Sequence, residues 1–263
     1  MAEILVTGGT GTLGRQLVQQ LSYQGFDVGI LTTRRQLDLP SGAKIFFGDL
    51  AENTGVNRAV ENARVIIHMA SDPGDARRVD FEGTKNLLGC INTSGLRHLI
   101  YVSIAGVDQA AYAYYQIKME VEKMLLASDI PCSVLRATQF HDFVLNKLIK
   151  PFDKMDGSPL RIPKGIRLQP IDVKDVAYKL QLMAMGPALR STITIGGPEI
   201  LTIDEMTRSY LGVLGRNDVI VSDEVKGELY DLFRSGININ ADWTGGRITW
   251  AQYLQQNLRN LQP

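Results

Sequence analysis

The sequence predicts an α/β protein whose core is a doubly wound parallel sheet. Two observations predict this class: short apolar runs alternate with segments of helical periodicity, and most of these runs are apolar on both faces. Strands that are covered by helices on both sides have this composition. A length of 263 residues with 44% hydrophobic content allows one compact unit with an appended lobe.

The elements follow in a regular order along the chain. Strands are expected at Ile4–Thr7, Val28–Leu31, Lys44–Phe47, Val65–Met69, Leu99–Ser103, Cys132–Arg136 and Thr192–Ile195. Helices are expected at Gly11–Gln24, Asn53–Glu61, Val79–Ser94, Tyr114–Ser128 and Asp172–Met185. Two helix starts carry a capping pattern, Asp49 with Glu52 and Thr202 with Glu205.

The alternation changes after Arg136, where prolines interrupt the pattern, and again after Gly197. We therefore expect a core formed by residues 1–137 and 170–197, and a small interleaved C-terminal cap formed by residues 138–169 and 198–263. Caps of this kind cover the carboxyl edge of the sheet, where ligands bind in open α/β folds.

Composition argues against several classes of partner. Lysine and arginine total 28 against 28 acidic residues, without a run of five like charges, so we expect neither nucleic acid nor a membrane surface as partner. The N-terminus lacks the features of a signal peptide, which favours a cytoplasmic location. The two cysteines lack CxxC spacing and no two histidines have metal-ligand spacing, so no metal site is expected. A small-molecule substrate is the expected partner, and the chain is expected to be a monomer or a homodimer.

A glycine-rich turn follows the first strand. Gly8, Gly11 and Gly14 have the spacing GxxGxxG and open an amphipathic helix. The first glycine permits the tight turn, the second lets backbone amides approach a pyrophosphate, and the third allows the helix to pack closely on the strand. This strand, turn and helix unit predicts a dinucleotide site.

The end of the second strand bears on which dinucleotide is preferred. An NAD site has a carboxylate here, whereas this sequence has Thr33, Arg34 and Arg35. A guanidinium can bind a 2′-phosphate through paired hydrogen bonds, so NADP(H) is favoured over NAD(H). The alternative is that both arginines are solvated surface residues. The ends of the third and fourth strands also face the crevice and add candidates for the adenine and its ribose: Asp49, Leu50, Met69, Ala70 and Ser71.

Tyr114 and Lys118 are four residues apart in a helical segment, on one face of it. An ammonium beside a phenol favours the phenolate and lowers its pKa, which lets a tyrosine exchange a proton with a carbonyl or an alcohol. Ser103, at the end of the fifth strand, is a candidate second hydrogen-bonding group for the same oxygen. These three residues are the candidate catalytic group.

With these motifs the chain resembles the short-chain dehydrogenase/reductase superfamily, in its extended or atypical branch with NmrA-like members. The resemblance covers nearly the whole chain, and it rests on TGGTGTLG at 7–14, GDL at 48–50, VIIHMAS at 65–71, VDFEGTKNLL at 79–88, YVSIAGV at 101–107, YYQIK at 114–118, LRATQFHDFV at 135–144 and QPIDVKDVA at 169–177. It implies a Rossmann-type fold.

The resemblance also implies roles for individual residues. Tyr114 would be the acid/base, Lys118 would bind the nicotinamide ribose, and Ser103 would orient the reacting oxygen. Many relatives have two adjacent serines there, and the second is Ile104 in this chain, which leaves the serine role open. Asn86 matches an asparagine that supports the active-site backbone in relatives.

Further positions complete the candidate site. The cofactor-binding set is expected to be Gly8, Thr10, Gly11, Thr12, Leu13, Gly14, Thr33, Arg34, Arg35, Asp49, Leu50, Met69, Ala70, Ser71, Lys118, Ala137 and Thr138. Substrate contacts are expected from Gln139, Phe140 and His141, which follow the sixth strand. The other histidines, His68 and His98, are expected to be packed or surface groups.

The function predicted is that of an NADP(H)-dependent oxidoreductase that transfers hydride to or from a small carbonyl, alcohol or quinone-like substrate. One alternative is an NmrA-like regulator that senses NAD(P) without turnover. Another is a nucleotide-sugar epimerase or dehydratase.

Overall fold

The computed structural model describes residues 2–35 and 42–258, which form two compact units. Among the described residues, the first consists of residues 2–35, 42–136 and 176–193, and the second of residues 137–175 and 194–258. Each unit is described by itself below.

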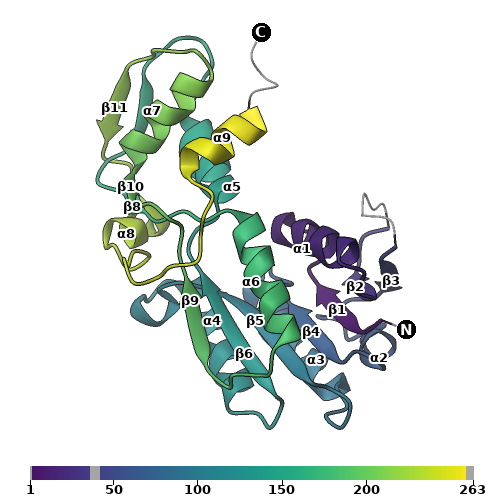
Figure 1. Ribbon diagram of the computed structural model, residues 1–263. Helices are drawn as coiled ribbons and strands as arrows, with labels where there is room; N and C mark the ends of the chain where they lie inside the picture. Colours follow the sequence, from purple (N-terminus) through teal and green to yellow (C-terminus); the bar gives the residue numbers. More distant parts are fainter. Residues whose placement is uncertain (1, 36–41, 259–263) are drawn as a thin grey trace. The chain divides into compact units, whose positions relative to one another are not determined.

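A parallel sheet of seven strands, in the order β3-β2-β1-β4-β5-β6-β9, is the centre of the fold (Figure 1). The strands are β1 (Ile4–Thr7), β2 (Val28–Thr32), β3 (Lys44–Phe47), β4 (Val65–His68), β5 (His98–Ile104), β6 (Cys132–Ala137) and β9 (Thr192–Ile195). Strand order reverses direction at β1, which pairs in parallel with both β2 and β4. Ligands bind at such a reversal, outside the carboxyl ends of the strands. The predicted Rossmann-type α/β class is confirmed.

Helices cover both faces of this sheet. They are α1 (Thr12–Tyr23), α2 (Val56–Val60), α3 (Gly83–Cys90), α4 (Ala113–Leu126) and α6 (Val173–Met185), with a π-helical turn η1 (Arg77–Glu82) before α3 and a short 3-10 turn η2 (Val107–Gln109) before α4. α1 and α6 lie on one face, and α2, α3 and α4 on the other (Figure 1). Alternate residues of β1, β4 and β5, including Leu5, Ile66 and Leu99, are buried under the second group of helices. All four residues of β1 and of β4 are buried, as expected for central strands.

Three local predictions are wrong. Asp49 does not begin a helix: its carboxylate accepts the amides of Ala51 and Glu52 in a turn, and α2 starts only after Gly55, whose φ is +70°. The helix expected at 79–94 begins earlier, at Arg77, and ends at Cys90 because Ile91 is extended. The edge strand β3 is largely exposed instead of apolar and covered.

The second unit is built from small elements. They are α5 (His141–Phe143), η3 (Val144–Ile149), η4 (Lys150–Phe152), β7 (Leu160–Pro163), β8 (Arg167–Leu168), β10 (Leu201–Thr202), α7 (Ile203–Val213), β11 (Ile220–Asp223), α8 (Glu228–Arg234) and α9 (Trp250–Leu258). β7 pairs with β11, and β8 with β10. The capping box predicted for Thr202 and Glu205 is confirmed at the start of α7. Trp250 is fully buried in this unit and donates its ring N–H to the carbonyl of Met206, so it belongs to the unit's own core.

Candidate functional site

The glycine turn between β1 and α1 is close-packed on one side and open on the other. Gly8 has a φ of +69°, and a Cβ there would lie 2.7 Å from the backbone of Met69 and Ala70. A Cβ on Gly14 would lie 2.2 Å from the Gly8 carbonyl oxygen. A Cβ on Gly11 would meet only that same oxygen, at 3.4 Å. Two of the glycines are therefore needed for packing, and Gly11 leaves room for a ligand.

The first turn of α1 fits a phosphate group. No side chain caps this helix, and its first backbone hydrogen bond runs from the Arg15 amide to the Gly11 carbonyl. The amides of Thr12, Leu13 and Gly14 precede that bond, so they have no partner within the helix. Unpartnered amides at the positive end of a helix dipole bind phosphates. The residues present thus fit a dinucleotide pyrophosphate.

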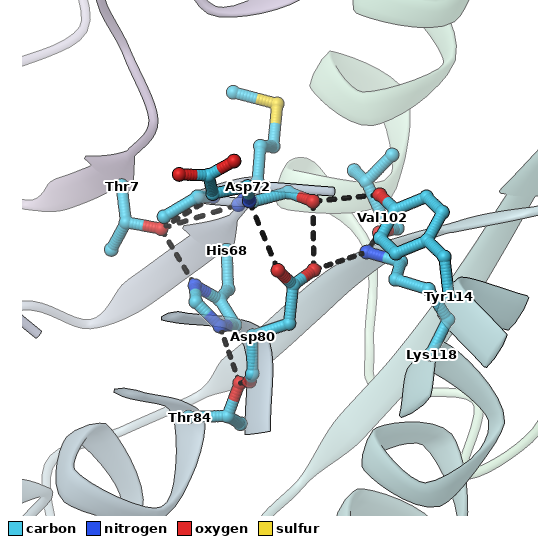
Figure 2. A network of polar contacts seen from close by, with 11 residues as sticks. Thr7, His68, Asp72, Asp80, Thr84, Val102, Tyr114 and Lys118 are labelled. Carbon is cyan, nitrogen blue, oxygen red and sulfur yellow. Dashed lines mark hydrogen bonds and ion pairs between the residues drawn. The ribbon is translucent and has the colours of Figure 1, made fainter. Parts of the chain in front are cut away.

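A chain of hydrogen bonds ties this turn to the end of β4 (Figure 2). The Thr7 hydroxyl accepts the amides of Met69 and Ala70, at 3.2 Å each, and lies 2.6 Å from Nδ1 of His68. On the other side of the ring, Nε2 lies 2.8 Å from the Thr84 hydroxyl. That hydroxyl donates to the backbone carbonyl of Asp80.

The bonds at Thr84 fix the proton on the His68 ring. A backbone carbonyl only accepts, so the Thr84 proton is committed to Asp80 and His68 must donate from Nε2. Nδ1 is then the acceptor for Thr7. Burial lowers the pKa of His68 to about 3, and the positive charge of Lys118 acts in the same direction. His68 is a neutral structural link between β1, β4 and the segment around Asp80.

Two of the predicted 2′-phosphate residues, Thr33 and Arg35, line a cavity beside the second strand. Its volume is about 470 Å³, and its lining residues are Thr32, Thr33, Arg35, Phe47, Gly48, Asp49 and Thr54. Arg34 and Arg35 are exposed, and Arg34 also reaches the Thr10 carbonyl at 3.5 Å. Asn86 donates to the carbonyls of Leu50 and Ala51 and so fixes the loop after β3.

Tyr114 and Lys118 both project from α4 toward one carboxylate, that of Asp80 (Figure 2). The Ser71 hydroxyl lies 2.7 Å from the Tyr114 hydroxyl and donates to Asp80 Oδ1 at 2.7 Å. Lys118 Nζ lies 3.4 Å from the same Oδ1 and donates to the carbonyl of Val102 at 3.0 Å. Asp80 Oδ2 accepts the amide of Asp72. The tyrosine and the lysine are thus joined through Ser71 and Asp80.

The electrostatics differ from the expectation that Lys118 lowers the pKa of Tyr114. The pKa of Tyr114 is raised well above its usual value, mainly by burial and next by the charge of Asp80. Burial lowers the pKa of Lys118, and Asp80 opposes that effect. The predicted direction for Tyr114 is wrong in this structure, because burial of the phenol and, next, the charge of Asp80 raise its pKa.

Ser103 is buried in β5, and no group in the described part of the chain forms a hydrogen bond with its hydroxyl oxygen. An unpaired buried hydroxyl is uncommon in a native fold. The neighbouring Ile104 is half-buried. The role of Ser103 stays a prediction.

The expected substrate residues belong to the second unit. Gln139 is buried and Phe140 is half-buried. His141 has no exposed surface: its ring packs against Trp250 and Tyr253, and its Nδ1 lies 3.6 Å from Asp172 Oδ2. Ala137 and Thr138, expected near the nicotinamide, are buried as well. Their roles also stay predictions.

Sequence reasoning missed Asp80 and the Thr7, His68 and Thr84 chain. The available signal was the spacing of Asp80, Thr84 and Leu87, which places the two polar residues on the same helix face as an apolar one. A single aspartate near a helix start usually faces solvent, and this one is fully buried.

The sequence matches the family described as NAD(P)H-binding over residues 8–156. The chain belongs to this NAD(P)H-binding family. The match spans the glycine turn, the strand ends and the Tyr114–Lys118 segment, and the resemblance to short-chain dehydrogenases/reductases is confirmed.

The relatives of this NAD(P)H-binding protein include an assembly factor and a reductase. Photosystem II assembly factor Ycf39 of Trieres chinensis is 25% identical over 267 residues, covering 95% of this chain and 81% of the relative. Divinyl chlorophyllide a 8-vinyl-reductase of Arabidopsis thaliana is 26% identical over 245 residues, covering 81% of this chain and 58% of the relative. Two other Ycf39 proteins are covered over only 48% and 49% of their length.

Among solved structures, dTDP-glucose 4,6-dehydratase of Bacillus anthracis in complex with NAD has a TM-score of 0.75 at 18% identity, covering 98% of this chain and 96% of that one. At this identity the similarity concerns the fold. No helix within residues 2–35 and 42–258 has the length and apolar character needed to cross a membrane.

Proposed function

We propose that this protein is an NADP(H)-dependent oxidoreductase in which Tyr114 supplies the proton. The observation that carries the proposal is the position of the Tyr114 phenol, 2.7 Å from the hydroxyl of Ser71 in the loop after β4, in the same unit as the glycine turn. When bound, the reduced cofactor supplies a hydride to an electrophilic carbon. A carbonyl oxygen that receives this negative charge needs a proton from a positioned acid.

The Tyr114 phenol keeps its proton at neutral pH, since burial and the charge of Asp80 raise its pKa. The protonated phenol is the form that donates to an oxygen in a reduction. The net direction depends on which form of the cofactor and of the substrate is supplied, and we propose reduction of a small carbonyl or quinone-like compound.

The cofactor would be held by the residues of the glycine turn and the neighbouring strand ends. The amides of Thr12, Leu13 and Gly14 would bind the pyrophosphate, as their open position allows. Arg34 and Arg35 would bind the 2′-phosphate of NADPH, which is the reason for preferring it to NADH.

The second unit would act as the substrate-binding cap, with Gln139, Phe140 and His141 nearest to the substrate. The boundaries expected for this cap, residues 138–169 and 198–263, belong to the proposal. A cytoplasmic location and a monomeric or homodimeric state belong to it as well.

The test is a fluorescence titration of the purified protein with NADPH and, separately, NADH, followed by turnover on a panel of carbonyl and quinone substrates. We expect tighter binding of NADPH, and we expect Tyr114→Phe to abolish turnover while leaving NADPH binding within about twofold. Tyr112→Phe is the matched control, since Tyr112 precedes the same helix without a lysine four residues later. Equal turnover in Tyr114→Phe and the wild type would contradict the proposal.

A second function is favoured by the substituted serine and by the Ycf39 relative. With Ile104 beside Ser103, and with the Tyr114 hydroxyl bonded to Ser71, the protein would bind NADP(H) without turnover and act in the assembly of another protein. NADPH binding without turnover on any substrate favours this function. An epimerase or dehydratase would instead retain tightly bound NAD through purification.

A further inference from the structure

Asp80 holds a central position among the polar groups near Tyr114. It is fully buried, it lies in the π-helical turn η1, and both of its carboxylate oxygens are bonded. Oδ1 contacts Ser71 and Lys118, and Oδ2 accepts the amide of Asp72. A buried carboxylate with this many donors is fixed in place.

The directions of these hydrogen bonds follow from the donors available. The Ser71 hydroxyl has one proton, and it donates that proton to Asp80. The oxygen of Ser71 therefore accepts from Tyr114, whose phenol must carry a proton to make this 2.7 Å contact. Asp80 thus favours the protonated phenol through Ser71.

The ammonium of Lys118 is directed toward other groups. It bonds to Asp80 and Val102, and it lies 4.4 Å from the centre of the Tyr101 ring. Three nearby acceptors, a carboxylate, a carbonyl and an aromatic face, hold its positive charge. The negative charge of Asp80 also offsets the positive charge of Lys118 at the Tyr114 hydroxyl.

Charged groups on η1 and α4 surround Tyr114. Asp80, from η1, raises the pKa of the Tyr114 phenol, and the neighbouring Tyr115 and Tyr112 act in the same direction. Lys118 and Glu122, from α4, belong to the same buried cluster, since Asp80 and Glu122 both raise the pKa of Lys118. At the surface, Arg77 of η1 pairs with Glu120 of α4.

We propose that Asp80 is a positioning residue for the reaction, which keeps the Tyr114 proton in place by holding Ser71 as an acceptor and by outweighing the charge of Lys118. This role rests on the proposed reductase function, for which it ensures that Tyr114 enters each cycle as an acid. Asp80 touches neither the phenol nor any reacting atom, and it acts through Ser71 and Lys118.

The direct test measures the ionisation of Tyr114 itself. The tyrosine at position 114 is replaced with 3,5-difluorotyrosine, whose ring fluorines lower the phenol pKa into an accessible range, and its single ¹⁹F resonance is followed against pH in the cofactor-free protein. In an Asp80→Asn background we expect the midpoint to fall by about one pH unit or more. An unchanged midpoint would overturn the proposal.

Asp75→Asn is the matched control. Asp75 precedes the same turn, and its exposed carboxylate pairs with Arg78. Its removal changes the net charge equally, and we expect the midpoint to stay within about 0.3 pH unit of the starting protein. A shift as large as that of Asp80→Asn would mean that net charge, and not the position of Asp80, is responsible.

The double variant Asp80→Asn/Lys118→Met keeps the test decisive if Asp80→Asn does not fold. It removes both members of the buried Asp80–Lys118 pair. If Asp80 outweighs Lys118 at Tyr114, the midpoint falls in this double variant. A rise would mean that Lys118 dominates and would overturn the proposal.

Activity gives a second, separable readout. For a reductase, kcat should fall where Tyr114 loses its proton. Since the Tyr114 pKa is raised, we expect the wild type to keep its kcat up to about pH 10, and we expect the fall to begin at lower pH in Asp80→Asn. Absence of turnover in the wild type would contradict the proposed reductase function. The ¹⁹F midpoint would still decide whether Asp80 controls the ionisation of Tyr114. A wild type with turnover and an unchanged ¹⁹F midpoint would contradict only the role of Asp80.

Discussion

The hydroxyl of Thr7 lies 2.6 Å from Nδ1 of His68, and this contact joins the carboxyl ends of β1 and β4. These two strands border the point where the strand order reverses. The same hydroxyl accepts two amides of the loop that leads to Ser71. One threonine therefore sets the distance between the glycine turn and the loop that carries the tyrosine's partner.

His68 should make folding stability depend on pH. Its pKa is about 3 in the folded protein and 6.5 when exposed, so the unfolded chain binds the extra proton between these values. The stability that this pKa difference contributes is therefore present above pH 6.5 and is lost as the pH falls toward 3. We expect the advantage of the wild type over His68→Gln in urea unfolding to shrink by about 2 kcal/mol between pH 7 and pH 5. A constant difference would mean that His68 is not buried in its neutral form.

Two glycines of the turn should respond differently to alanine. In Gly14→Ala the new methyl group overlaps the Gly8 carbonyl, and we expect unfolding to become easier by about 2 kcal/mol or more. Gly11 has a φ of −78°, which alanine tolerates, and its Cβ position is open.

Gly11→Ala should therefore lose less than about 1 kcal/mol of stability and yet bind NADPH at least ~10-fold more weakly, because its methyl group takes the space of the pyrophosphate. Thermal unfolding and NADPH titration of the two variants separate the effects. Undiminished NADPH affinity in Gly11→Ala would show that the phosphate lies elsewhere.

Arg35 should determine the choice of cofactor. Removing its guanidinium in Arg35→Ala should weaken NADPH binding by about 10- to 100-fold and leave NADH binding unchanged, because only NADPH carries the 2′-phosphate. Arg58→Ala is the control, since Arg58 is exposed on α2 and does not line the 470 Å³ cavity. A parallel loss for both cofactors would contradict the proposed 2′-phosphate site.

The buried pair of Asp80 and Lys118 should be strongly coupled in stability. Lys118→Met leaves the Asp80 carboxylate buried without its counter-charge, which costs about 3–5 kcal/mol of folding stability. Asp80→Asn likewise leaves the Lys118 ammonium buried without its counter-charge. The double variant should lose less than the sum of the two single losses. Urea unfolding of the four proteins measures the coupling, and additive losses would contradict it.

Much of the fold could be predicted from the sequence because the strands are buried on both faces. The run Ile4–Thr7, which is buried throughout, has the predicted bounds. Thr192–Ile195 has them as well, although it is only partly buried. The glycine turn was recognisable because its spacing has a steric reason, which the close contact of Gly14 with Gly8 illustrates. The capping pattern at Asp49 was misleading, since an aspartate stabilises a turn as well as it begins a helix.

The candidate site was predictable only in part. The spacing of Tyr114 and Lys118 put them on one face of α4, but spacing cannot specify which group each side chain bonds. Those partners, Ser71 and Asp80, come from the segment after β4, and pairing across such a distance depends on the folded chain. The direction of the Tyr114 pKa shift could not be predicted without them.

The direction in which Asp80 points depends on the number of residues in the π-helical turn Arg77–Glu82, as well as on the residue at position 80. Such a wide turn holds one residue more than an α-helix would over the same stretch. Losing one residue there would rewind the helix and rotate Asp80 by about 100° relative to the residues that follow. A related protein that lacks this extra residue would present a different position at the place of Asp80. A sequence alignment without a gap there would pair Asp80 with a residue that faces another direction, and the equivalent of its carboxylate would be missed.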